Sequence, residues 1–141
     1  MKIIMIAPSG AAATAFEQLP LNESDDTLVL SRVLPDAGSR SLVLTPSLSR
    51  ATAWAERTLG GSVIGRNVLR LTVLDPGRRF AGATRRSRSL RPELESADLI
   101  VVLERNGVLA GWHASRGPAR NARVVYGIPA ARGVISESRV P

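Results

Sequence analysis

The first sixteen residues, MKIIMIAPSGAAATAF (1–16), decide the fold class. A nearly continuous apolar run over 2–7 is typical of a strand that is covered on both faces. A Pro-Ser-Gly turn at 8–10 ends this run. The alanine-rich stretch that follows predicts a helix to about Leu19, with Ser9 as its N-cap. A strand, a turn and a helix in this order form the repeating unit of a parallel α/β sheet.

The remaining residues continue this alternation. Further strands are predicted at Thr27–Leu34, Ser41–Thr45, Asp98–Glu104 and Ala122–Tyr126. Helices are predicted from Ser47 or Ser49 to Leu59, at Arg78–Arg88, from Pro92 to Ala97 and at Arg105–Arg116, with a polar tail after Gly127-Ile128-Pro129. Residues 63–74 fit a helix or a strand, and we favour a helix. We therefore predict a single Rossmann-like α/β domain over 1–141, with a mostly parallel sheet of about five strands and helices on both faces.

The composition excludes several classes of protein. A chain of 141 residues is long enough for one domain with a core that needs no metal or disulfide. It contains no cysteine, which excludes disulfides, thiolate nucleophiles and zinc–sulfur sites. No stretch approaches the roughly 20 apolar residues of a membrane-spanning helix, and the first apolar run is too short for a signal peptide. We therefore expect a cytoplasmic protein that does not cross a membrane.

Charge is distributed unevenly along the chain. The whole chain carries a formal net charge of +7. Residues 1–49 contribute −2, from three basic and five acidic residues, whereas 50–141 contribute +9, from 16 basic and seven acidic residues. This asymmetry predicts one face that attracts anions.

The densest basic segment lies between 78 and 91, where no acidic residue occurs. Guanidinium groups bind phosphates through paired hydrogen bonds, so this segment predicts contact with an anionic membrane surface or a phosphate-bearing ligand. A solvated basic face would have the same composition. Phe80 is the only aromatic residue of the segment, which gives little support for base stacking and makes nucleic acid an unfavoured partner. The candidate anion-binding residues are Arg78, Arg79, Arg85, Arg86, Arg88 and Arg91.

Other candidate site residues lie at predicted strand ends, where parallel sheets bind their ligands. Ser9 and Gly10 are candidate ligand-binding residues, because a helix N-terminus at this turn would offer amides to a phosphate. The dinucleotide fingerprint and the Walker pattern are absent, so a plain turn is the alternative and we predict no cofactor. Glu104 and His113 are candidate catalytic residues, and Glu104 is the carboxylate nearest in sequence that could orient the imidazole. A single histidine without cysteine predicts no metal site.

Three segments resemble a known family. SADLIVVLERNGVLAGWHASR (96–116), VVYGIPAARG (124–133) and KIIMIAPSG (2–10) are similar to the N-terminal Rossmann-like domain of two-domain, GT-B type bacterial glycosyltransferases. The resemblance implies an acceptor-binding half, with Ser9, Gly10 and Glu104 lining the crevice and a basic patch on the membrane. The family has a second half that binds the nucleotide sugar. The resemblance therefore implies that these 141 residues alone do not transfer sugar.

Three hypotheses about function stay open at this point. The first is the acceptor-side domain of a nucleotide-sugar-dependent glycosyltransferase, docked by its basic face on the inner face of the membrane. The second is a non-catalytic Rossmann-like module for binding or oligomerisation, with an interface near Trp54, Trp112 and Val124. The third is a nucleic-acid-binding protein that uses the arginine segment, for which binding should weaken steeply with salt.

Overall fold

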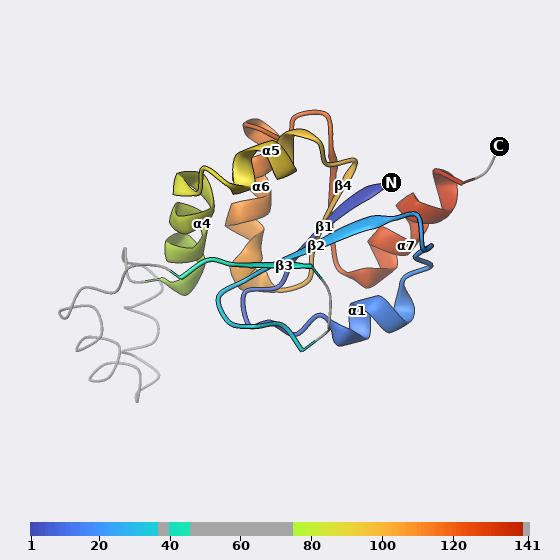
Figure 1. The fold of residues 1–141 in the computed structure, drawn as a ribbon, viewed down its shortest axis with the longest axis horizontal. Helices are drawn as coiled ribbons and strands as arrows, with labels where there is room; N and C mark the ends of the chain where they lie inside the picture. The colour runs from blue at the N-terminus through green and yellow to red at the C-terminus, as the bar shows by residue number, and fades with distance from the viewer. Residues whose placement is uncertain (37–39, 46–74, 140–141) are drawn as a thin grey trace.

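The computed structural model describes residues 1–36, 40–45 and 75–139 (Figure 1). The helices predicted from Ser47 or Ser49 to Leu59 and over 63–74 lie outside these ranges. In chain order the elements are β1 (Lys2–Ile6), α1 (Ala13–Gln18), β2 (Asp26–Ser31), β3 (Ser41–Val43), α4 (Pro76–Arg86), α5 (Leu90–Glu95), β4 (Leu99–Val102), the 3-10 turn η1 (Arg105–Gly107), α6 (Val108–Arg116), β5 (Arg123–Tyr126) and α7 (Ile128–Glu137).

The described strands form one parallel five-stranded sheet in the order β3-β2-β1-β4-β5. β1 lies in the centre, where Ile4 is paired with Leu28 of β2 on one side and with Ile100 of β4 on the other. This arrangement confirms the predicted α/β, Rossmann-like fold class. It also explains the continuous apolar runs, because a central parallel strand with helices on both faces has no side open to water.

The sheet separates two hydrophobic cores. Successive side chains of a strand point to opposite faces, so Ile4 and Ile6 of β1 pack in one core and Ile3 and Met5 in the other. The first core is shared with α4, α5 and α6, and the second with α1 and α7. Figure 1 shows these two groups of helices on opposite sides of the sheet. The molecule is therefore a three-layer α/β/α sandwich in the part described.

Two glycines allow α6 to lie very close to the sheet. A Cβ atom at Gly107 would lie 2.6 Å from Cγ2 of Ile6, and one at Gly111 would lie 2.6 Å from Cγ2 of Val102. A side chain at either position would displace the helix from the strands below it. This close contact fixes the position of α6, whose C-terminal turn contributes to the basic cleft described below.

The C-terminal helix α7 was not predicted, because residues after Gly127-Ile128-Pro129 were expected to form a polar tail. The expectation was wrong: Ala131 and Ile135 are fully buried against the sheet, and Pro129 lies in the first turn of the helix. Proline is well tolerated there because the first helical N–H groups need no partner within the helix. Among the described residues the longest helix, α4, has 11 residues, and none is long and apolar enough to cross a bilayer.

The second strand is shorter than predicted. It was expected at Thr27–Leu34 but ends at Ser31, and Val33 and Leu34 are exposed. The hydroxyl of Ser31 donates to the carbonyl of Val33 at 2.6 Å, and this bond turns the chain away from the sheet. The apolar residues that follow therefore belong to a loop beyond the strand.

Glu93 of α5 joins three segments at the amino ends of the strands. Its carboxylate lies 2.6 Å from Nζ of Lys2 in β1 and 2.5 Å from Nη2 of Arg40, which precedes β3. The hydrogen bond from Lys2 lowers the pKa of Glu93 below its ordinary value of 4.5, although burial acts in the opposite direction. The ionised carboxylate is therefore favoured in the folded protein, and it stabilises the fold above pH 4.5.

Replacing Glu93 by glutamine should make unfolding less sensitive to acid. In the wild type this contribution is complete above about pH 4.5 and is lost as pH falls through the lowered pKa, whereas glutamine does not titrate. At pH 7 we expect E93Q to lower the free energy of unfolding by about 1–3 kcal/mol. Urea denaturation of the wild type and of E93Q, each at pH 7 and at pH 3, would measure the difference in the free energy of unfolding at both pH values. A destabilisation as large at pH 3 as at pH 7 would contradict the assignment.

Candidate functional site

The carboxyl ends of β1 and β4 bring Ser9 and Glu104 together. The chain leaves β1 toward β2 on one side of the sheet and leaves β4 toward β5 on the other, so this edge is the topological switch point. The Ser9 hydroxyl donates to Oε1 of Glu104 at 2.5 Å, and the Ser9 amide donates to both carboxylate oxygens at 3.1 and 3.2 Å. The structure thus joins a candidate ligand-binding residue and a candidate catalytic residue that are 95 positions apart in sequence.

The amides of this turn already have acceptors within the protein. The Gly10 amide donates to the carbonyl of Ala7 at 2.8 Å, and the Ala11 amide to the Ser9 hydroxyl at 3.3 Å. The first amides of α1 bind Asp36, which follows β2: those of Ala12 and Ala13 each donate to its Oδ1 at 2.8 Å. A phosphate at this turn would therefore have to displace a carboxylate.

The N-cap prediction for Ser9 was wrong. Helix α1 begins at Ala13, and the side-chain oxygen that accepts from its first amides belongs to Asp36. Ser9 lies too early in the chain, with its hydroxyl directed to Glu104. The sequence separation of 24 residues between Asp36 and Ala12 hides this cap from any local pattern.

Gly10 has a backbone conformation that other residues rarely adopt. Its φ angle is +87°, and a Cβ atom there would lie 3.0 Å from both the Leu34 carbonyl oxygen and Cγ2 of Val33. The Gly10 carbonyl also accepts from the amide of Asp36 at 3.1 Å. The glycine therefore lets the first turn pack against the loop that supplies Asp36.

Removing the Asp36 carboxylate should destabilise the switch-point turn. In Asp36→Ala two amides lose their acceptor, and a lost N-cap acceptor typically costs about 1–2 kcal/mol. Asp36→Asn is the matched control, because its side-chain oxygen can still accept and we expect it to retain most of the stability. Urea denaturation would compare the two. Equal stability of the alanine variant and the wild type would contradict the capping role.

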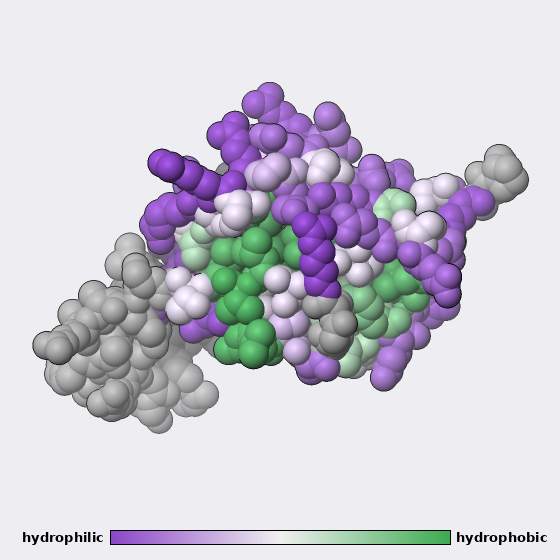
Figure 2. Space-filling view, viewed as in Figure 1, coloured by the Kyte–Doolittle hydropathy of each residue, from purple (hydrophilic) through white to green (hydrophobic). Residues whose placement is uncertain are grey.

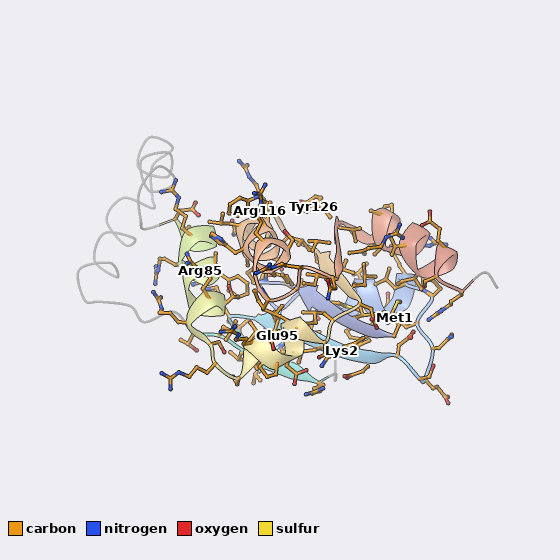
Figure 3. The ribbon with its side chains drawn as sticks, turned by 90° about the horizontal axis from the view of Figure 1, so that it is seen from above. Met1, Lys2, Arg85, Glu95, Arg116 and Tyr126 are labelled. Carbon is orange, nitrogen blue, oxygen red and sulfur yellow. The ribbon has the colours of Figure 1, made fainter. Side chains whose placement is uncertain are left out.

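A basic cleft of about 780 Å³ lies between α4, α5 and α6. The C-terminal ends of α4 and α6 both lie beside α5 (Figure 1), and Figure 2 shows hydrophilic side chains covering this end of the molecule. Figure 3 shows Arg85 on α4 and Arg116 on the neighbouring α6. The arginines that line the cleft are Arg85, Arg86, Arg88, Arg91, Arg116 and Arg120. Glu95 is the one carboxylate among the described lining residues.

The cleft unites part of the predicted arginine set with residues that the sequence did not indicate. Arg78 and Arg79 lie in the first turn of α4, at its opposite end, and do not line the cleft. Arg116 and Arg120 were not predicted, because β4 and at least most of α6 separate them from the arginine segment. Only the packing of α6 beside α4 brings them to the same cleft, so no local pattern could have found them.

The described contacts divide the arginines of the cleft into two groups. Arg91 forms an ion pair with Glu95 at 2.9 Å, Arg116 lies over the ring of Trp112, and Nε of Arg120 donates to the carbonyl of Gly117 at 3.3 Å. The second group consists of Arg85, Arg86 and Arg88, which face the solvent. No carboxylate of the described residues lies within 4.0 Å of their guanidinium groups.

Helix dipoles alone do not explain this concentration of charge. Basic residues in a last helical turn stabilise the negative C-terminal end, and Arg85, Arg86 and Arg116 occupy such turns. Two helix ends carry about one elementary negative charge together. The described lining residues carry a net charge of +5, from six arginines and one glutamate. Most of the positive charge is therefore left to attract an anion from solution.

His113 and Glu104 are not brought together as a catalytic pair. His113 lies in the last turn of α6 and lines the basic cleft, where its ring meets that of Trp112 edge-on at 5.0 Å. Glu104 precedes η1 at the other end of the same segment and binds Ser9. No described hydrogen bond joins them, so the structure provides no carboxylate from Glu104 to orient the imidazole.

The residues expected at an oligomer interface are also separated. Trp112 is half-exposed beside the basic cleft, with 49% of its surface accessible. Val124 of β5 instead packs against the core beneath α6, and Trp54 lies outside the described residues. Within the described ranges there is also no group of three or more histidine or acidic residues that could hold a metal ion.

The comparisons with known proteins provide no relative from which a function could be transferred. No protein-family model, no curated protein and no solved structure matches this chain.

Proposed function

We propose that this domain binds a ligand that presents several phosphate groups, and that the cleft between α4, α5 and α6 is the site. The observation that carries the proposal is the convergence of six arginines from separate segments on one cleft with a single carboxylate. Guanidinium groups suit phosphate because two parallel N–H groups match two of its oxygens. The volume of about 780 Å³ is in the range of small-molecule sites.

The base of the cleft determines which part of the ligand is recognised. Leu90, Leu94, Ala110 and Ala114 lie beneath the arginines and are at most 6% exposed. No open apolar slot for an acyl chain exists among these residues. The contact is therefore made through phosphate oxygens at the arginine rim, whether these belong to a soluble molecule or to the headgroups of an anionic membrane.

The finer form of the proposal is the acceptor-side domain of a nucleotide-sugar-dependent glycosyltransferase, held at an anionic membrane by the basic cleft. The sequence resemblance motivates it, and the Ser9–Glu104 pair at the switch point supports it by offering a carboxylate to a hydroxyl group. Ligand-observed NMR with a panel of saccharides tests this form. A bound saccharide that is lost in Ser9→Val would support it, and a panel without any bound member would count against it.

Calorimetric titration with inorganic pyrophosphate tests the phosphate-binding proposal. We expect binding that weakens as NaCl is raised from about 50 to 200 mM, because arginine–phosphate contacts release counterions. Flotation with phosphatidylglycerol vesicles, compared with phosphatidylcholine vesicles, distinguishes membrane phosphates from soluble ones. Binding in neither arm at the lower salt concentration, or binding that does not respond to salt, would contradict the proposal.

A further inference from the structure

Arg116 is the arginine of the cleft that an aromatic side chain holds in place. Its Cζ atom lies 5.1 Å from the centre of the Trp112 ring, within the range of a cation–π interaction. The His113 ring meets the same indole edge-on, with centroids 5.0 Å apart and planes inclined by 66°. The ring of His113 thus supports the indole of Trp112, and the indole in turn orders the guanidinium group of Arg116.

Arg120 is restrained at the same end of the cleft. Its Nε atom donates to the carbonyl of Gly117, one residue beyond α6, at 3.3 Å. By contrast, no carboxylate of the described residues pairs with Arg85 and Arg86 of the last turn of α4, or with Arg88 of the link that follows. An arginine that is already ordered loses less conformational entropy when it binds a ligand. The α6 end is therefore the preorganised part of the cleft.

We propose that the C-terminal turn of α6 forms a phosphate subsite, in which Arg116 and Arg120 bind one phosphate group and Trp112 positions Arg116. The α4 arginines then contact further phosphate groups of the same ligand. This inference rests on the proposed function, since it assigns the order of recognition within that cleft. Trp112 acts through Arg116 and is a positioning residue. It touches no phosphate in this assignment.

Substitutions of Trp112 test the subsite with inorganic pyrophosphate as the probe. Trp112→Leu removes the aromatic face, and we expect affinity to fall about two- to fivefold, the value of an exposed cation–π contact. Trp112→Phe keeps an aromatic face and should retain most of the wild-type affinity for pyrophosphate. Arg116→Gln removes the guanidinium group itself and should weaken binding about tenfold. Val108→Ala is the matched control, since Val108 is 46% exposed one turn earlier on α6.

Fluorescence provides a readout that a merely structural role would not change. The chain has two tryptophans, so Trp54→Phe leaves Trp112 as the only one. Pyrophosphate should change the Trp112 emission in this background, and the change should disappear when Arg116→Gln is added. Far-UV circular dichroism of each variant verifies the fold. Substitution of Trp112 should not disturb the fold, because this side chain is half-exposed.

The possible outcomes separate the subsite from the proposed function. If Trp112→Leu and Arg116→Gln bind pyrophosphate as the wild type does while Arg85→Gln/Arg86→Gln binds weakly, the subsite is wrong and the cleft remains a phosphate site. Equal losses in Trp112→Leu and Trp112→Phe would contradict the cation–π role. If the wild type does not bind pyrophosphate, the subsite is wrong. If it also does not bind phosphatidylglycerol vesicles, the proposed function fails with it.

Discussion

Replacement of Phe80 by alanine is expected to lower the free energy of unfolding by about 3–5 kcal/mol. Phe80 is fully buried in the core between α4 and the sheet, where it packs near Ile4 and Leu90. Alanine would remove the ring and leave a cavity that α4 can close only in part, because α4 also packs against α6. A loss of this size is a large part of the total stability of a small domain.

The other phenylalanine of the chain is a matched control for this experiment. Phe16 of α1 is only partly buried, at the edge of the second core. Phe16→Ala should therefore cost clearly less than Phe80→Ala, because less apolar surface is returned to water. Urea denaturation of both variants gives the comparison. Equal losses, or a loss below about 1 kcal/mol for Phe80→Ala, would contradict the described packing of α4.

Neutralising three arginines of the cleft should nearly abolish phosphate binding. In Arg85→Gln/Arg86→Gln/Arg116→Gln each lost charge removes about 1 kcal/mol of attraction to a phosphate surface, so affinity should fall about 100-fold. The three side chains are exposed and lie at the rim of the cleft. Each charge also stabilises a helix C-terminal end by about 0.3–1 kcal/mol, so the free energy of unfolding should fall by at most about 3 kcal/mol. Urea denaturation of the variant separates this loss of stability from the loss of binding.

A control variant with the same net charge distinguishes the cleft from general electrostatic attraction. Arg78, Arg105 and Arg132 are exposed and lie outside the cleft, and replacing them by glutamine also lowers the net charge by three. Calorimetric titration with pyrophosphate compares the two variants. We expect the affinity of the control variant for pyrophosphate to stay within about threefold of the wild-type affinity, since distant exposed charges are screened by salt. Similar losses in both variants would contradict a defined site.

The strands could be predicted from sequence because their environment is uniform. The apolar residues Leu99–Val102 and those of β1 are buried on both faces of the sheet, so the runs are continuous and no polar residue interrupts them. The helix α7 was missed for the opposite reason. Only two of its apolar residues, Ala131 and Ile135, are fully buried, and Arg132, Gly133 and Val134 lie between them, so only the packed sheet reveals which face is buried.

The two candidate sites show where local patterns are insufficient. Ser9 and Glu104 were predicted separately at two strand ends, and they are in contact because the carboxyl ends of β1 and β4 lie side by side in the sheet. Their roles in binding and catalysis stay predictions. The hydrogen bonds from the first amides of α1 to Asp36 depend on a contact with the loop after β2. The sequence around α1 therefore gives no indication of them. The arginine segment likewise indicated four of the six arginines of the basic cleft, and the other two, Arg116 and Arg120, depended on how α6 packs.

The central claim is that phosphate binds at the helical cleft and does not bind at the switch-point turn. NMR of the uniformly ¹⁵N-labelled protein during titration with inorganic pyrophosphate tests it most directly, because arginine Nε–Hε groups and backbone amides are observed together. We predict shifts of the side-chain signals of Arg85, Arg86, Arg116 and Arg120, with unchanged amide signals at residues 9–13. Shifts confined to the amides of residues 9–13, with the arginine signals unchanged, would contradict the claim.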